Sequence, residues 1–324
     1  MRLTRPPAIR PTISSLGSKG ESSRQPVSSI SRADEAFWKA GQALSRELIA
    51  PIADQLVTGR VLLVTDDVLQ EVPFAGLPWP DNSPASQPSP LVIHIETIHI
   101  PSASAAAAIR AASHPRAGFA KDISVFADPV FAERIRMRVT GDSAEALSRM
   151  VPAEKIGVFT GLNASLEKLK SAHLEDYRVV YFATHADIDA DRPETSGIRL
   201  SNVDAQGRSQ PDRLRILDIY QLHMHPDLVV LGDCNSAEGT NRAGEGLVTF
   251  ARAFLFAGAR RVIATLWPVE SVPAMGLTTP MLSRLLGSQR LNPSAALRQT
   301  QLSLWNTGIS PRQWSAFIMI GDWD

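Results

Sequence analysis

The chain has 324 residues, and its 33 Lys and Arg balance its 33 Asp and Glu, so the formal net charge is zero. A chain of this length can bury a substantial core as one large or two smaller domains. The charge balance disfavours a protein that binds nucleic acid or anionic membranes, because such proteins carry a basic excess or a basic patch. No apolar stretch is long enough to span a bilayer, and no secretory signal is recognised. The single cysteine excludes an internal disulfide and a cysteine-rich metal site, and it suits a reducing compartment, so we expect a cytoplasmic protein without metal or cofactor.

Residues 1–33 differ in composition from the rest of the chain. They are rich in Ser, Arg and Pro, with one acid against six bases, and they show neither helical nor strand periodicity. This composition is typical of a disordered or linker segment. From Glu35 to Leu56 the apolar residues recur at helical spacing. Strands are expected at Arg60–Thr65 and Leu91–Ile100, followed by an alanine-rich helix.

Beyond about residue 120, apolar strands alternate with helical segments. Strands are expected at Ile123–Ala127, Lys155–Thr160, Arg178–Thr184, Leu228–Gly232, Arg261–Leu266 and Ala316–Ile320. Helices are expected at Ala144–Met150, Ser165–Ala172, Gly246–Ala257, Ala274–Leu286 and Ser294–Trp305. This alternation is typical of βαβ units, in which a mostly parallel sheet has helices on both faces.

Two chemically reactive residues follow two of these strands. Cys234, the only cysteine, comes just after Leu228–Gly232, and His185 comes directly after Arg178–Thr184. Parallel strands that are buried on both faces read as unbroken apolar runs, and their carboxyl ends meet at the edge where open α/β sheets bind ligands. We therefore expect the thiol and the imidazole to face one cleft. A thiolate nucleophile with an imidazole acid–base partner is the dyad of a cysteine peptidase.

Several further segments support this interpretation by their order and spacing. They are Leu48–Pro51, Val72–Leu77, Tyr181–His185, Leu228–Cys234, Gly244–Ala259, Val262–Val269, Ala296–Leu297 and Trp314–Asp322. Together they resemble the CHAT domain, a caspase/separase-like module of the clan CD cysteine peptidases that is often found beside tetratricopeptide repeats. The histidine precedes the cysteine by 49 residues, which is similar to the order and the spacing of roughly 50 residues in caspases.

The resemblance implies a caspase-like α/β fold, with a mostly parallel sheet flanked by helices on both faces and an amino-terminal α/β extension packed on it. It divides the chain into a linker at 1–33, the amino-terminal part of the module at 34–120 and its catalytic part at 121–324. It also implies an oxyanion hole formed by the backbone amides of Cys234 and Ala186. The chain departs from the family at Ala186, where glycine is usual, and at Asp233, where members commonly read Ser-Ala-Cys.

The two loops that carry the dyad are rich in aspartate. Asp187 and Asp233 are candidate substrate-binding residues, because a carboxylate in the pocket for the residue before the scissile bond would select Arg or Lys. Alternatively, these aspartates bond to their own backbone, as aspartates in turns commonly do. Trp267, at the end of another strand, either forms a wall of that pocket or is buried in the core.

We expect a cysteine endopeptidase that cleaves a partner protein or peptide through a thioester acyl-enzyme, using His185 and Cys234. A regulatory protein, such as a helical-repeat partner, is the other partner that the resemblance implies. The alternative is a catalytically silent CHAT scaffold or sensor that acts in protein–protein interaction. Retention of both members of the dyad favours the enzyme.

Overall fold

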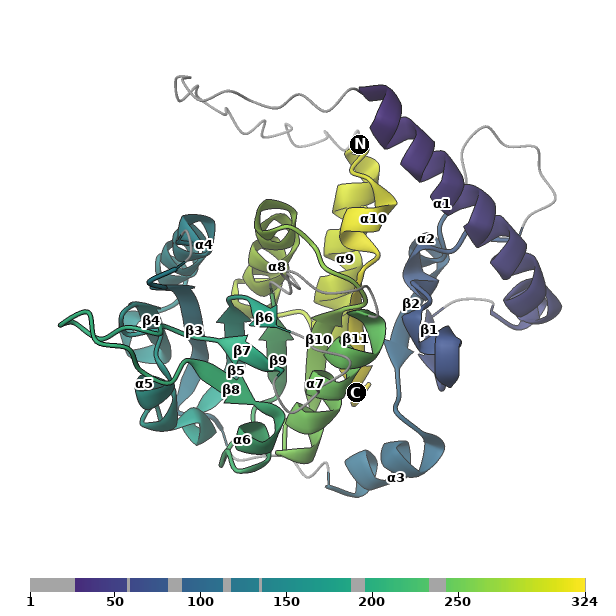
Figure 1. The fold of residues 1–324 in the computed structure, drawn as a ribbon. Coiled ribbons are helices and arrows are strands. Elements are labelled where there is room, and N and C mark those ends of the chain that lie inside the picture. The colour runs from purple at the N-terminus through teal and green to yellow at the C-terminus, as the bar shows by residue number, and fades with distance from the viewer. Residues whose placement is uncertain are drawn as a thin grey trace, which may run out of the picture.

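An eight-stranded sheet forms the centre of the molecule. The computed structural model describes residues 27–56, 59–80, 89–112, 118–133, 136–187, 196–232 and 243–323. Within them the strand order is β1-β2-β11-β10-β9-β5-β3-β4 (Figure 1). The strands are β1 (Gly59–Leu63), β2 (Ile95–His99), β3 (Lys121–Pro129), β4 (Ile156–Gly161), β5 (Tyr177–Ala183), β9 (Leu228–Leu231), β10 (Arg261–Thr265) and β11 (Phe317–Gly321). Neighbours pair in parallel except β10 with β11, so the expected mostly parallel sheet is confirmed.

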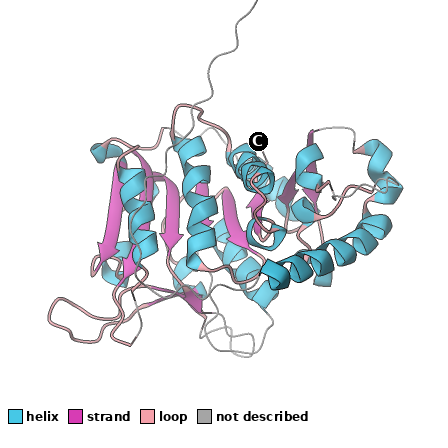
Figure 2. Ribbon diagram, turned by 90° about the horizontal axis from the view of Figure 1, so that it is seen from above, coloured by secondary structure: helices cyan, strands magenta, loops and turns pink. Residues whose placement is uncertain are grey.

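Helices cover both faces of this sheet (Figure 1 and Figure 2). On one face lie α4 (Arg138–Ser148), α8 (Ser271–Leu286) and α9 (Pro293–Asn306), and on the other lie α5 (Leu166–Lys170), α6 (Ile216–Tyr220) and α7 (Ala243–Phe256). The shorter elements are η1 (Ala50–Gln55), η2 (Asp67–Glu71), η3 (Phe74–Gly76), η4 (Ala153–Lys155), η5 (Leu174–Asp176) and α10 (Pro311–Trp314). Among the described helices, none is both long and apolar enough to cross a bilayer.

Strand β5 illustrates how the two helical layers share the core. Its residues Val179, Tyr181 and Ala183 are buried in the cluster that α4, α8 and α9 complete. The alternate residues Val180 and Phe182 are buried in the cluster that α5, α6 and α7 complete. Successive side chains of a strand point to opposite faces, so a strand buried on both faces must be apolar throughout.

The amino-terminal part of the chain extends the sheet at one edge. It contributes α1 (Val27–Leu48), α2 (Leu91–His94) and α3 (Ala103–Ala112) besides β1 and β2. A small core of its own is formed by Ile49, Phe74, Leu77, Leu91 and Ile95. The extension joins the rest of the sheet where β2 pairs in parallel with β11, at His99 and Ile320.

Two elements of this extension differ from expectation. Helix α1 begins at Val27, so residues 27–33 are helical although a disordered or linker segment was expected there. The sequence allows this, because no Pro or Gly interrupts residues 27–33 and apolar Val27, Ile30 and Ala33 keep a helical spacing. The expected strand at Leu91–Ile100 begins as the short helix α2 and only then becomes β2. Arg298 of α9 donates to two carbonyl oxygens of this helix, those of Val92 (2.9 Å) and Ile93 (2.7 Å).

A second, three-stranded sheet was not foreseen. It consists of β6 (Ala186–Asp187), β7 (Gly197–Arg199) and β8 (Arg213–Arg215), paired antiparallel in that order. We call it the small sheet. It begins three residues after β5 ends, so it continues directly from the carboxyl edge of the large sheet.

Gly232 follows the last residue of β9 and lies against the ring of Tyr181. Its N–H donates to the carbonyl oxygen of Phe182 at 2.9 Å. A Cβ at this position would lie 2.6 Å from Cε2 of Tyr181. The Tyr181 hydroxyl is itself held by α8, at 2.8 Å from Thr278 Oγ1 and 3.2 Å from Met275 Sδ. The ring therefore has little freedom to move away, and only glycine fits.

Gly232→Ala is expected to lower the free energy of unfolding by about 1–3 kcal/mol, because it overpacks the junction between β9 and α8. The matched control is Gly276→Ala in α8, where an added Cβ meets no atom within 4 Å. That change should instead stabilise the helix by about 0.5–1 kcal/mol. Urea denaturation of both variants measures the two changes, and equal stabilities would show that the contact with Tyr181 is unimportant.

His99 lies buried where the extension joins the large sheet. Its ring packs edge-on against Phe74, with centroids 6.0 Å apart, and it borders a small cavity of about 20 Å³ shared with Thr65, Gln70 and Arg252. Nε2 of His99 has no hydrogen-bond partner among the described residues. Burial lowers the pKa of His99 from its ordinary 6.5 to about 4, because the charged imidazolium would lose its hydration.

This depressed pKa makes the free energy of unfolding depend on pH. As the pH falls below 6.5 the unfolded chain binds a proton at His99, whereas the folded chain does so only near pH 4. His99 therefore contributes stability above pH 6.5 that is lost as the pH falls toward 4, by up to about 1.4 kcal/mol per pH unit. Denaturant titrations between about pH 7.5 and about pH 4.5 should show a shallower pH dependence of the free energy of unfolding for His99→Gln than for His173→Gln, a control at an exposed histidine. Identical slopes would contradict the assignment.

Candidate active site

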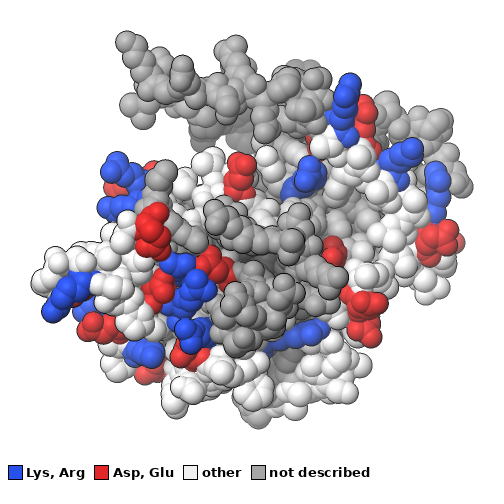
Figure 3. All heavy atoms as spheres, in the orientation of Figure 1, with Lys and Arg blue, Asp and Glu red and all other residues white. Residues whose placement is uncertain are grey.

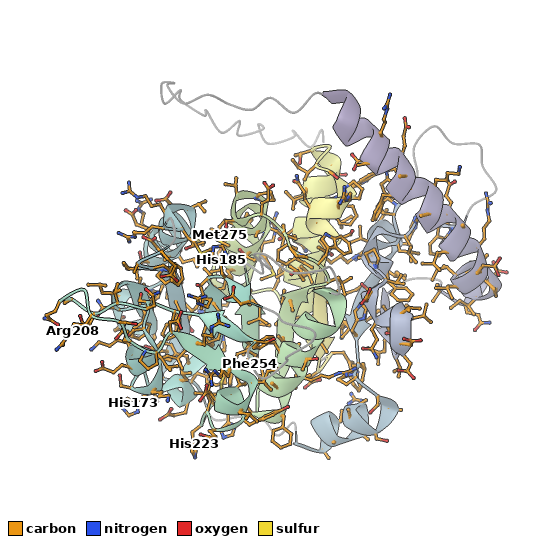
Figure 4. The ribbon with its side chains drawn as sticks, in the orientation of Figure 1. His173, His185, Arg208, His223, Phe254 and Met275 are labelled. Carbon is orange, nitrogen blue, oxygen red and sulfur yellow. The ribbon has the colours of Figure 1, made fainter. Side chains whose placement is uncertain are left out.

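His185 lies at the carboxyl edge of the large sheet, two residues beyond the end of β5 (Figure 4). Its side chain is half-buried. The main chain around it is fixed by β7: Thr184 Oγ1 donates to the carbonyl oxygen of Arg199 at 2.6 Å, and the Arg199 N–H donates to the carbonyl oxygen of His185 at 2.7 Å. The imidazole is thus carried by a backbone that both sheets hold.

Ala186 is the first residue of the small sheet and lies opposite Ile198. Because the Arg199 N–H bonds to His185, the neighbouring pair Ala186–Ile198 is a non-hydrogen-bonded pair of the antiparallel ladder. The N–H of Ala186 therefore points away from β7, as a donor to another group must. Ala186 has no left-handed backbone angle, so the absence of the family's usual glycine costs no strain here.

The end of β9 lies next to the end of β5. The two strands pair in parallel, from Val179 opposite Leu228 to Phe182 opposite Leu231, and Gly232 continues this pairing through its bond to Phe182. Cys234 follows Gly232 by two residues along the chain. Both Cys234 and Asp233 lie outside the described residues.

Asp187 belongs to an ion-pair cluster of the small sheet. Its Oδ2 lies 2.7 Å from Arg199 Nη1 and 3.3 Å from Arg213 Nη2. Arg199 is also 2.6 Å from Asp212 and 3.1 Å from Glu133. Asp187 is therefore paired with two arginines of the small sheet, and its candidate role in binding a basic substrate side chain stays a prediction.

The charges in this cluster stabilise one another. Burial alone would lower the pKa of Arg199, but the hydrogen bond to Asp187 and the charges of Asp212 and Asp187 outweigh it and raise that pKa. A hydrogen bond from Asn202 holds the pKa of Glu133 below its ordinary value. On the face shown in Figure 3, acidic and basic side chains lie interspersed over this region, so no patch of one sign marks it.

Trp267 lies after β10, the neighbour of β9, at the same edge of the large sheet. Its side chain is half-buried, and Nε1 donates to the carbonyl oxygen of Arg312 at 3.0 Å. The indole forms part of a cleft of about 540 Å³, whose charged lining residues are Asp34 of α1, Glu270 and Arg312. Trp267 is thus partly accessible beside this cleft and also packs against the core clusters on both faces of the sheet, so both of the roles considered for it stay open.

The structure therefore brings His185, Ala186, Asp187 and Trp267 to one edge of the sheet, together with Gly232. The residues that sequence reasoning missed are the other members of the ion-pair cluster, which are Arg199, Asp212, Arg213 and Glu133. For the two arginines a signal exists, because Arg199 lies between Ile198 and Leu200 and Arg213 precedes Leu214 and Arg215, and such alternation is typical of short half-buried strands.

Solved structures and curated proteins similar to this chain were found by comparison. Yeast (Saccharomyces cerevisiae) separase, in its complex with securin at 3.0 Å, superposes with a TM-score of 0.50 at 13% identity, covering 81% of this chain and 15% of that one. Mature-domain gingipain RgpB of Porphyromonas gingivalis, in complex with its pro-domain, gives 0.48 at 10% identity over 89% of this chain and 68% of that one. Tetratricopeptide repeat protein 28 of Mus musculus is 30% identical over 134 residues, and that of Homo sapiens is 32% identical over 110 residues.

These likenesses have different weights. The chain spans only 5% and 4% of the two curated relatives, and the separase likeness concerns the caspase-like fold alone. The family model of the CHAT domain matches residues 39–322. This match covers both the amino-terminal extension and the large sheet with its helices, so the chain belongs to the CHAT domain family.

Proposed function

We propose that this protein is a cysteine endopeptidase in which Cys234 and His185 form the catalytic dyad. The observation that carries the proposal is the parallel pairing of β5 with β9, extended by the Gly232–Phe182 hydrogen bond. The chain leaves both strands at one edge of the sheet. His185 follows β5 there, and the only cysteine follows Gly232 by two residues along the chain. Membership of the CHAT family supports the same assignment.

The chemistry requires His185 to accept and return a proton twice, once as the thioester forms and once as it is hydrolysed. The Cys234 thiolate attacks the scissile carbonyl carbon after His185 has taken the thiol proton, and the amine then leaves with that proton as the thioester forms. Water, deprotonated by His185, attacks the thioester, and the thiol is regenerated as the acid product departs. The N–H of Ala186, which points away from β7, is suited to stabilise the oxyanion together with the N–H of Cys234, and one such donor contributes roughly 3 kcal/mol to lowering the barrier.

The substrate would be a protein or peptide whose residue before the scissile bond enters the cleft beside Trp267. This cleft borders the end of β10, next to β9. Asp233 remains a candidate for binding a basic side chain there. Asp187 is the weaker candidate, because two arginines already pair with it. A helical-repeat partner is proposed as the regulator, since the curated relatives are named as tetratricopeptide repeat proteins.

Labelling with peptidyl acyloxymethyl ketones tests the dyad, because this reaction reports thiol nucleophilicity without turnover. Wild type should be labelled and Cys234→Ala should not. His185→Gln should lower the labelling rate and kcat by about 100- to 10,000-fold, the usual contribution of a general base. His223→Gln is the matched control and should behave as wild type, since His223 lies beside η5 and α6, away from His185 (Figure 4).

Two results would contradict the dyad. One is equal reactivity of His185→Gln and wild type. The other is silence of wild type toward every peptide and candidate partner, with and without a helical-repeat activator, which would favour the scaffold alternative.

Cleavage of a random-sequence peptide pool tests the proposed substrate cleft. Trp267→Ala should raise KM by about tenfold with less change in kcat, because it removes contact area in the ground state and the transition state alike. Trp267→Phe keeps the apolar surface but loses the bond to Arg312, so it serves as the matched comparison. Unchanged KM and an unchanged preference at the cleaved bond in both variants would place the substrate elsewhere.

A further inference from the structure

Arg199 is the centre of the ion-pair cluster described above. Its side chain is only 6% exposed, yet within the described part of the chain it contacts three carboxylates, of Asp187, Asp212 and Glu133. These come from β6, from the residue preceding β8, and from the loop after β3. The guanidinium also stacks on Phe131, 5.3 Å from the ring centroid. One planar side chain therefore connects the small sheet to the edge of the large one.

The main chain of Arg199 holds the segment that carries His185. Its carbonyl oxygen accepts from Thr184 Oγ1 and its N–H donates to the carbonyl oxygen of His185, at 2.6 and 2.7 Å. The hydroxyl group of Thr184 and the carbonyl group of His185 are thus both bonded to the main chain of Arg199. Displacement of Arg199 would displace the backbone of His185 with it.

The residues that follow Arg199 are anchored in turn to the large sheet. Ser201 Oγ accepts from the Val130 N–H at 3.0 Å and donates to the Gly161 carbonyl oxygen at 2.7 Å. These partners lie at the carboxyl ends of β3 and β4. Asn202 adds a bond to Glu133 at 2.6 Å, which directs that carboxylate toward Arg199. The cluster therefore has a fixed position relative to the end of β5.

We propose that Arg199 is a positioning residue for catalysis, which sets the height of His185 above the sheet edge through its carboxylate contacts and its two main-chain bonds. The inference rests on the proposed function, because it gives a role to a residue that acts through the catalytic imidazole. A planar fork is needed for this task, since three carboxylates approach from different elements. Lysine keeps the charge but reaches them only as a point donor.

Arg199→Lys is the decisive variant, because it preserves the charge balance of a buried cluster that removal of the arginine would leave uncompensated. We expect kcat to fall by about 100-fold with KM nearly unchanged, since a displacement of about 1 Å in a catalytic group has effects of this size. Thr184→Val, which removes only the hydroxyl bonded to Arg199, should reduce kcat in the same direction. If Arg199→Lys fails to fold, Thr184→Val still tests the proposal.

The matched control is Arg208→Lys. Arg208 pairs with Asp204 at 2.7 Å in the same connection between β7 and β8, but it is 75% exposed and lies far from His185 (Figure 4). It should leave kcat and KM as in wild type. A merely structural Arg199 would lower the melting temperature of Arg199→Lys while kcat per folded molecule and its pH profile stayed the same.

Hydrogen exchange of the amides in residues 184–187 and of Arg199 gives a readout that needs no turnover. Exchange there should be faster in Arg199→Lys than in Arg208→Lys, at matched global stability. Equal exchange and equal kcat in the two variants would overturn the proposal. If wild type neither cleaves peptides nor reacts with ketone probes, the peptidase function fails, and the exchange experiment still decides whether Arg199 fixes the His185 segment.

Discussion

The parallel pairing of β5 with β9 is the constraint on which the rest of the candidate site depends. Four residue pairs and the bond from Gly232 to Phe182 fix the register of these two strands. A shift by one residue would exchange the sets of side chains that face the two helical layers, and it would bury polar strand ends. The apolar packing on both faces therefore determines which residues emerge at the edge. The position of His185 at this edge is therefore a consequence of core packing.

The small sheet supplies main-chain hydrogen-bond partners to the residues that follow β5. A strand end alone leaves the following residues without main-chain partners, and loops of this kind are mobile. Here the chain turns from β5 into β6 and pairs at once with β7, so His185 and Ala186 are held within three residues of the core. The ion-pair cluster holds this sheet in place by charge. A cluster of this kind is a weak source of stability, but it requires a specific arrangement of its members.

Much of the large sheet could be predicted from the sequence, and the reason is physical. β5 and β9 are buried on both faces, so their apolar runs stand out in the sequence. His185, which follows β5, lies at the carboxyl edge as this pattern predicts. The strands of the small sheet contain two or three residues each, and half of them are polar. Such strands exist only because tertiary contacts hold them. The same holds for α2, whose carbonyl groups bond to Arg298 more than two hundred residues later.

The position of His185 at the sheet edge could be predicted from the sequence, whereas the ion-pair cluster around Arg199 could not. The pairing of His185 with Cys234 stays a prediction, because Cys234 lies outside the described residues. His185 follows a strand whose burial fixes its place, whereas Arg199 gains its role from carboxylates on three separate elements. No local pattern contains that convergence. Alternation around Ile198 and Leu214 indicates a strand, yet it does not reveal that an arginine of this strand is buried.

The pairing of β2 with β11 has a consequence for biosynthesis. β2 ends at His99, and the strand against which it pairs starts only at Phe317. Arg60 likewise donates to the carbonyl oxygen of Trp323, a separation of 263 residues. During translation the amino-terminal strands must therefore wait with an unpaired edge until β11 has left the ribosome, and such edges favour aggregation in nascent chains. We therefore expect folding of the nascent chain to depend on chaperones until β11 pairs with β2.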